Sequence, residues 1–230
     1  YGPALWLDTK GDAMDVDALA SAIEEDIVFG VYAPGSRLVE DRLLERFATS
    51  RYVIRAVFAE LEARGLVLRI PNRGVQVVEL APDDVDELHA IRQILETSAA
   101  EITPLPAPAD LLERLDALRG EHEAAIARGD FREVFRLDIA FHAVQYSSCP
   151  NRHLQQAIAD YARKVHVIRA VKYGDRDYLD EVRRQHRAIV EALRGTDAGI
   201  YRDRIRAHLP PSSQAYRAAY AVKYGAAHRR

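Results

Sequence analysis

The stretch Ser50-Arg51-Tyr52-Val53-Ile54-Arg55 decides the fold of the N-terminal third of this chain. Its first residue is a good N-cap, because a serine oxygen can accept a backbone N–H from the first turn of a helix. Apolar residues recur at helical spacing at Val53, Val57 and Leu61, and Gly65 can end the helix. The sequence therefore predicts a helix after Ser50 with one buried face.

The segments on either side of this helix complete a known architecture. Residues 15–30 have the spacing of a first helix, the turn at Pro34-Gly35 follows, and a short second helix carries Leu43, Leu44 and Phe47. Behind the third helix, Leu66–Ile70 and Val75–Val78 alternate as strands around a turn at Pro71–Gly74. Three helices and a two-stranded hairpin predict a winged helix-turn-helix domain in residues 15–80.

The charge of this region favours DNA as its partner, although the formal net charge of the whole chain is −3. Between Arg46 and Arg73 the sequence has six arginines against two acidic residues. Arg51 and Arg55 are four residues apart and so share one face of the predicted helix. A guanidinium group can bond both acceptors of a guanine in the major groove. The alternative, a solvated arginine face, explains neither the turn nor the hairpin around it.

After Pro82 the sequence predicts only helices, so residues 83–230 are expected to form an all-α antiparallel helical bundle and the fold class is mainly α. The predicted helices cover 83–102, 108–128, 131–147, 151–172, 176–194 and 198–209, with a further segment after Pro210-Pro211. Breaks are expected at Cys149-Pro150 and at Gly174. Residues 1–14 are interpreted as an N-terminal extension or as sequence left from cloning.

Composition excludes several other classes of protein. Hydrophobic residues make up 48% of the chain and charged residues 29%, an ordinary balance for a globular protein. No run of 18 apolar residues and no signal peptide is present, so no membrane association is expected. The single cysteine, Cys149, cannot form an intramolecular disulfide and suits the reducing cytoplasm.

The second half carries the residue types of a metal site. Asp138 and His142 are four residues apart among apolar neighbours, so carboxylate and imidazole share one helical face. A buried carboxylate or imidazole is costly unless it is paired or coordinates an ion. His186 and His208 lie on two later helices. Together the four side chains predict a site for a divalent metal, with Zn as the first choice and Ni as an alternative.

The remaining histidines are interpreted as surface or supporting residues; they are His89, His122, His153, His166 and His228. Pro210-Pro211 directly follows the last predicted helix. A proline disfavours α-helical geometry in the residue before it, so Leu209 is expected to leave that geometry. His208 would then lie at a frayed helix end.

The N-terminal motifs resemble those of the GntR-type transcriptional regulators. The resemblance rests on Gly30–Leu38, on Ser50–Arg55, and on Leu61–Val67 followed by Arg73-Gly74-Val75. It implies DNA contacts from Arg42, Ser50, Arg51, Tyr52, Arg55, Arg73 and Gly74. Ala56 stands where the family mostly has glutamate, and Tyr52 replaces a smaller residue, so the resemblance does not predict the operator sequence.

Residues 83–209 resemble the FCD effector domain of the FadR branch, in its shorter six-helix form. Asp138, His142, His186 and His208 fall on the metal-ligand positions of that domain. Arg92 and Glu96 match its "R..LE" helix, and Asn151 matches a recurrent asparagine. The resemblance implies a small organic acid as effector, and Arg92 and Asn151 are the predicted ligand-binding residues.

These features together predict a DNA-binding regulator whose operator affinity is controlled by an organic acid bound at the metal. A homodimer on a pseudo-palindromic, double-stranded operator is expected, because one helix-turn-helix reads only a half-site. Two alternatives remain: a metal-dependent hydrolytic enzyme, and a regulator whose metal is purely structural. No general base or nucleophile stands beside the metal-site residues in sequence, so a protein without catalytic residues is the prediction.

Overall fold

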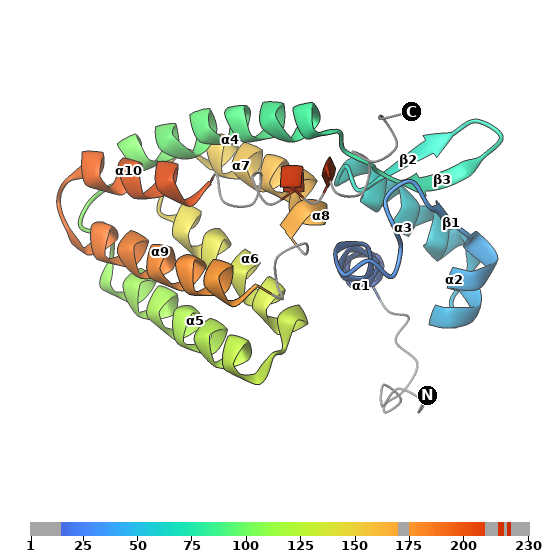
Figure 1. Ribbon diagram of the computed structural model, residues 1–230, viewed down its shortest axis with the longest axis horizontal. Helices are drawn as coiled ribbons and strands as arrows, with labels where there is room; N and C mark the ends of the chain where they lie inside the picture. The colour runs from blue at the N-terminus through green and yellow to red at the C-terminus, as the bar shows by residue number, and fades with distance from the viewer. Residues whose placement is uncertain (1–14, 170–174, 210–215, 219, 222–230) are drawn as a thin grey trace.

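The computed structural model describes residues 15–169, 175–209, 216–218 and 220–221. Its elements are, in chain order, α1 (Val16–Val28), β1 (Arg37–Leu38), α2 (Glu40–Phe47), α3 (Arg51–Ala63), β2 (Val67–Ile70), β3 (Gly74–Val77), α4 (Pro82–Ile102), α5 (Ala109–Arg128), α6 (Phe131–Ser147), α7 (Arg152–Lys164), α8 (His166–Arg169), α9 (Arg176–Arg194) and α10 (Ala198–His208). Figure 1 shows α1–α3 and the sheet at one end and the long helices at the other. The predicted 1–14 extension, the break at Gly174 and Pro210-Pro211 lie outside the described residues.

The N-terminal part is the predicted winged helix-turn-helix, with one strand more than expected. Leu19, Ile23, Ile54 and Leu61 are fully buried between the helices, and residues of the sheet close the same core. The sheet has the order β1-β3-β2, with both pairs antiparallel. The two-residue strand β1 corrects the prediction of a two-stranded hairpin. Two residues are too few to show the alternation by which a strand is recognised.

Helix α3 begins and ends as its sequence predicts. The Ser50 side chain accepts a hydrogen bond from the Val53 backbone N–H at 3.3 Å. At the other end Gly65 has a φ of +74°, a conformation that favours glycine. These two residues fix the length of α3 and therefore which side chains stand at its exposed N-terminus.

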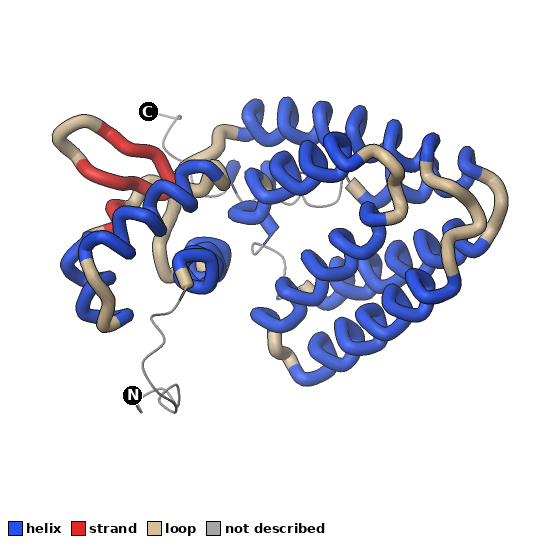
Figure 2. The backbone as a smooth tube through the Cα atoms, turned by 180° about the vertical axis from the view of Figure 1, so that it is seen from behind, coloured by secondary structure: helices blue, strands red, loops and turns tan. Residues whose placement is uncertain are grey.

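The C-terminal part is the predicted bundle of helices (Figure 2). Helix α5 packs on α6 and α9, while α10 packs on α4 and α9. The centre is filled by large apolar side chains, among them Leu115, Phe141, Ile189 and Tyr201. The same packing brings α6, α9 and α10 together, and these three helices carry the predicted metal residues.

Two predictions about helix ends are wrong. The helix predicted over 151–172 ends at Lys164, where Val165 leaves helical geometry with φ −99° and ψ 7°, and the short helix α8 follows. Leu209, expected to leave α-helical geometry, keeps it with φ −73° and ψ −45°. Both Val165 and Leu209 are buried, so tertiary packing decides their backbone geometry.

The two halves of the chain meet through α1, which is in contact with α8 (Figure 1). Three consecutive acidic residues of α1, Glu24, Glu25 and Asp26, form what we call the α1 acidic triad. Arg132 Nη2 donates to Asp26 Oδ1 at 2.9 Å, and Arg136 Nε donates to Glu25 Oε1 at 2.6 Å. Both arginines belong to α6, so this helix is tied directly to the winged helix.

An apolar contact and a buried pair reinforce this junction. Val28 at the end of α1 shares a buried cluster with Phe135 of α6, and the rings of Phe29 and Phe135 meet edge to face. His166 of α8 contacts Glu24 Oε1 through Nδ1 at 2.7 Å, and both side chains are buried. Burial alone would raise the pKa of Glu24, but hydrogen bonds and charge from His166 and Arg64 hold it below its ordinary value.

Candidate metal centre and DNA-binding surface

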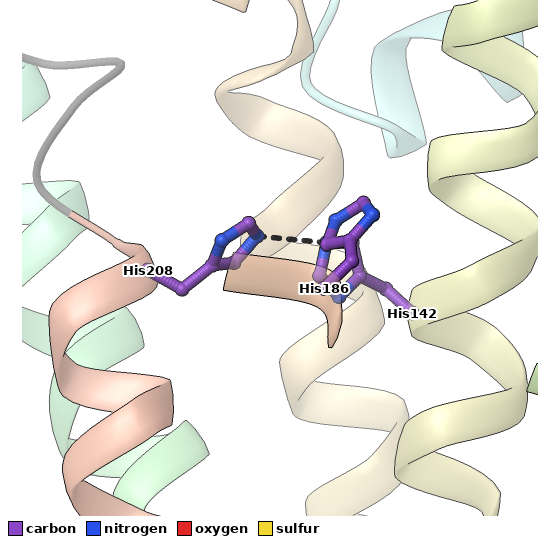
Figure 3. A group of neighbouring side chains, drawn as sticks. All are labelled: His142, His186 and His208. Carbon is purple, nitrogen blue, oxygen red and sulfur yellow. Dashed lines mark hydrogen bonds between the residues drawn. The ribbon is translucent and has the colours of Figure 1, made fainter. Parts of the chain in front are cut away.

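The structure brings the four predicted metal residues together. Asp138 and His142 project from successive turns of α6, His186 comes from α9, and His208 is the last residue of α10. Figure 3 shows His142 and His208 facing each other, with Nε2 atoms 3.1 Å apart. Oδ1 of Asp138 lies 3.6 Å from Nε2 of His142 and 3.4 Å from Nε2 of His186. Four donors on one ion with bonds of roughly 2.1 Å would be spaced by similar amounts.

Two glutamines orient the rings of His142 and His208. Nδ1 of His142 lies 3.0 Å from Oε1 of Gln145, and Nδ1 of His208 lies 2.8 Å from Oε1 of Gln185. Because an amide oxygen only accepts, each Nδ1 carries the proton and donates it. Each Nε2 is then a bare lone pair, and the two lone pairs face each other. This arrangement is unfavourable without a cation and is how metal-binding histidines are commonly oriented.

His186 supplies a second test of the metal interpretation. Its side chain is 0% exposed, and neither ring nitrogen has a hydrogen-bond partner among the described residues. Burial lowers the pKa of His186 to about 4, so the imidazole is neutral and can act as a metal ligand near pH 7. Its nearest polar atom is Asp138 Oδ1, 3.4 Å from Nε2, and a buried imidazole without a well-formed hydrogen bond is costly on its own. The donor set therefore fits a divalent ion.

Of the two interpretations given to His122 and His166, the surface one is wrong, and the supporting one stays a prediction. Both side chains are buried, His122 at 2% exposure within α5. The His122 ring centre lies 5.3 Å from that of His186. Helical spacing would have placed His122 on the inner face with Leu111, Leu115 and Ala125, but sequence alone does not show which helix that face meets.

A cavity of about 660 Å³ opens beside the metal residues. Its walls include His142 and Tyr146 of α6, Arg92 of α4, and Arg163 and His166 at the junction of α7 and α8. This volume is typical of sites for small organic ligands. The cavity thus extends from the metal residue His142 to His166, which touches the α1 acidic triad.

Arg92 already has a partner in the structure. Its Nε donates to Glu96 Oε1 at 2.8 Å, and the Tyr146 hydroxyl bonds the other oxygen of Glu96. Burial and the Glu96 charge raise the pKa of Tyr146 well above its ordinary value, so the phenol remains protonated. Arg92 is therefore held at the cavity wall by a fixed carboxylate.

Asn151 stands at the N-cap of α7, where its side chain accepts from the backbone N–H groups of His153 and Leu154 at 3.0 and 3.1 Å. This position gives it a structural task. It is not among the residues that line the cavity, whereas its neighbour Arg152 is. Ligand binding by Asn151 stays a prediction.

The predicted DNA-reading residues stand together on an exposed surface. Tyr52 at the start of α3 is 83% exposed, and Arg51 and Arg55 extend beside it. Arg51 Nη2 contacts Asp41 Oδ1 at 2.8 Å, and Arg55 Nε lies 3.6 Å from Glu40 Oε1. Carboxylates of α2 therefore hold both arginines in the free protein.

The remaining predicted contacts flank this helix. Arg42 is exposed on α2, Arg73 is exposed in the turn between β2 and β3, and Gly74 is exposed at the start of β3. Gly74 has a φ of +82°, and a Cβ on this residue would lie 3.2 Å from Nε of Arg37. Arg37 is a cation of the wing that sequence reasoning did not single out. Arg37 lies next to Gly74 because β1 pairs with β3.

None of the helices in the described parts of the chain is both long and apolar enough to cross a bilayer.

The fold and the two sites define a class: a transcriptional regulator with a winged-helix DNA-binding domain and a helical domain beside it. A family model described as "FCD domain" matches residues 87–210, and one described as "Bacterial regulatory proteins, gntR family" matches residues 16–77. The chain belongs to the GntR family and carries its FCD domain.

Individual relatives agree with this assignment. The HTH-type transcriptional regulator YdhC of Bacillus subtilis is 29% identical over 187 residues, which cover 81% of this chain and 84% of YdhC. The galactonate operon transcriptional repressor of Escherichia coli is 28% identical over 203 residues, covering 79% of this chain and 87% of the repressor. These relatives are named as regulators of transcription.

Solved structures share the fold. Escherichia coli McbR/YncC superposes with a TM-score of 0.78 at 18% identity, covering 89% of this chain and 98% of that one. A GntR regulator from Rhodococcus gives a TM-score of 0.73 at 21% identity, with the same coverage. The arrangement of a winged helix beside a helical bundle is therefore common to these proteins.

Proposed function

We propose that this protein is a metabolite-responsive regulator that binds a pseudo-palindromic operator as a homodimer. A small organic acid bound beside a divalent metal would control its affinity for DNA. One observation carries the proposal: helix α6 carries Arg132 and Arg136, which bind the α1 acidic triad, in its first two turns, and Asp138 and His142 directly after them. A change at the metal residues can therefore reach the winged helix through a single element.

Asp138, His142, His186 and His208 would hold the metal, with Zn as the first choice. When bound, the ion supplies Lewis-acid positions that an oxygen donor of the effector can fill. Arg92 would pair with the effector carboxylate, because a guanidinium makes charge-assisted bonds to that group. His142 and Arg92 both line the 660 Å³ cavity, which supports one ligand contacting both.

The cavity itself supports a path for the response. His166 lies in its wall and contacts Glu24 of α1. An anion in the cavity would attract His166 and so compete with Glu24 of the α1 acidic triad for it. The DNA-binding heads would change their orientation, and operator affinity would change by the coupling free energy, typically about 1–3 kcal/mol.

The test begins with an operator selected by the protein from a random DNA pool. Zinc-loaded protein is titrated with this operator in the presence and absence of organic acids. Sugar acids come first, because one relative is named as a galactonate operon repressor. Parent and Arg92→Ala proteins are compared. We expect at least one acid to change the operator affinity of the parent by about 5- to 150-fold.

Two outcomes would decide against the proposal. If an acid binds by thermal shift but operator affinity does not change, the metal is purely structural. If the zinc-loaded protein turns over an ester or amide and binds no DNA, the hydrolytic alternative replaces it.

A further inference from the structure

His122 of α5 lies beside the metal residue His186, with ring centres 5.3 Å apart. Ligand atoms of His122, Asp138 and His186 all lie within 4.8 Å of one another, and so do those of His142, His186 and His208. The two groups share His186, and Asp138 contacts it at 3.4 Å. An ion bound by Asp138 and His186 would therefore have His122 within reach.

No hydrogen bond among the described residues explains a histidine at this position, and the ligand atoms close to it are those of Asp138 and His186. His122 is 2% exposed, and its Nδ1 has no hydrogen-bond partner among the residues that the structure describes. Its neighbours on the inner face of α5 are apolar. A leucine would fill such a position without the cost of a buried, unpaired polar atom.

We infer that His122 is a fifth protein donor to the metal, in addition to Asp138, His142, His186 and His208. The inference rests on the metal site of the proposed function. A fifth protein donor would leave the ion less room for an effector carboxylate, and a carboxylate oxygen not bound to the ion would be free to meet Arg92.

The experiment uses the full chain, freed of metal with a chelator and titrated with Co²⁺. Cobalt reports its own coordination number, because its visible bands strengthen as the number of donors falls from six toward four. Parent, His122→Gln and His122→Leu are compared, with His153→Gln as control because His153 lines the cavity but is exposed. We expect both His122 variants to bind Co²⁺ about 10- to 100-fold more weakly and with stronger visible bands.

The apo proteins separate this role from a purely structural one. Without metal, the buried ring of a ligand His122 destabilises the folded protein. His122→Leu should therefore melt at or above the melting temperature of the parent when no metal is bound. It should then lose most of the rise in melting temperature that metal gives the parent. Parent-like Co²⁺ affinity and spectrum in both variants would overturn the inference while leaving the four-donor site intact. A parent that binds no Co²⁺ would overturn the metal site as well.

Discussion

Arg51 and Arg55 meet the requirements for reading bases: they are exposed, on one face, and at the N-terminus of α3. We expect Arg51→Ala and Arg55→Ala each to weaken operator binding by about 1–3 kcal/mol and to relax its specificity. Fluorescence anisotropy at matched salt measures this, with Arg128→Ala at the far end of α5 as control. Parent-like affinity in both variants would show that α3 does not read the operator.

Glu24 makes the stability of the protein depend on pH. Its carboxyl has a lowered pKa in the folded state, below the ordinary value of 4.5. The stabilisation is therefore complete above about pH 4.5 and is lost as pH falls through the folded-state pKa. We expect Glu24→Gln to be less stable than the parent at pH 7 and to show a shallower loss of stability below pH 4.5. Denaturant unfolding measures this, and Glu45→Gln on the exposed face of α2 should follow the parent.

Helix α6 is the element on which the proposed response depends. Arg136→Glu should repel Glu25, and the double variant Glu25→Arg with Arg136→Glu should restore the contact. Arg136 is more than half exposed, so a double-mutant cycle on unfolding should give only about 0.2–1 kcal/mol. The larger effect should be on the response to effector. The effector should no longer change the operator affinity of Arg136→Glu, and it should change that of the double variant again. Arg187→Glu, which disturbs a pair inside the bundle, is the control.

Elements with strong local signals could be predicted from the sequence. Helix α3 has an N-cap, a regular apolar face and a terminal glycine, and all three behave as predicted. Asp138 and His142 could be paired because their spacing alone puts them on one face. His186 and His208 lie on other helices, and they were added as further imidazole donors and then matched to the ligand positions of the FCD domain.

Features that depend on distant parts of the chain could not be predicted. The break at Val165 has no glycine or proline to mark it, since packing against the rest of the molecule decides it. His122 was missed because its role depends on the approach of α9. The partners of the α1 acidic triad, Arg132, Arg136 and His166, lie more than 100 residues further along the chain, so only the fold brings them to it.

At the scale of the whole molecule, the metal residues join three helices that are far apart in sequence. We expect one divalent ion per chain in protein purified without added metal, and a lower melting temperature after chelation. An ion present at 100 times its Kd would add about 2.7 kcal/mol to the free energy of unfolding. Metal analysis and calorimetry measure both, and His142→Ala with His186→Ala should abolish the metal and the shift. Unchanged metal content in that double variant would place the ion elsewhere.

The pairing of Arg51 and Arg55 with Glu40 and Asp41 has a consequence for the search along a genome. Most DNA attracts a protein through its phosphates, whatever the sequence, and so competes with the operator. Here random DNA must displace carboxylates from the arginines without gaining contacts to bases in return. The operator offers guanine edges as compensation. Glu40→Gln with Asp41→Asn should therefore strengthen binding to random DNA more than to the operator, and the protein would spend more of its time on the wrong sites.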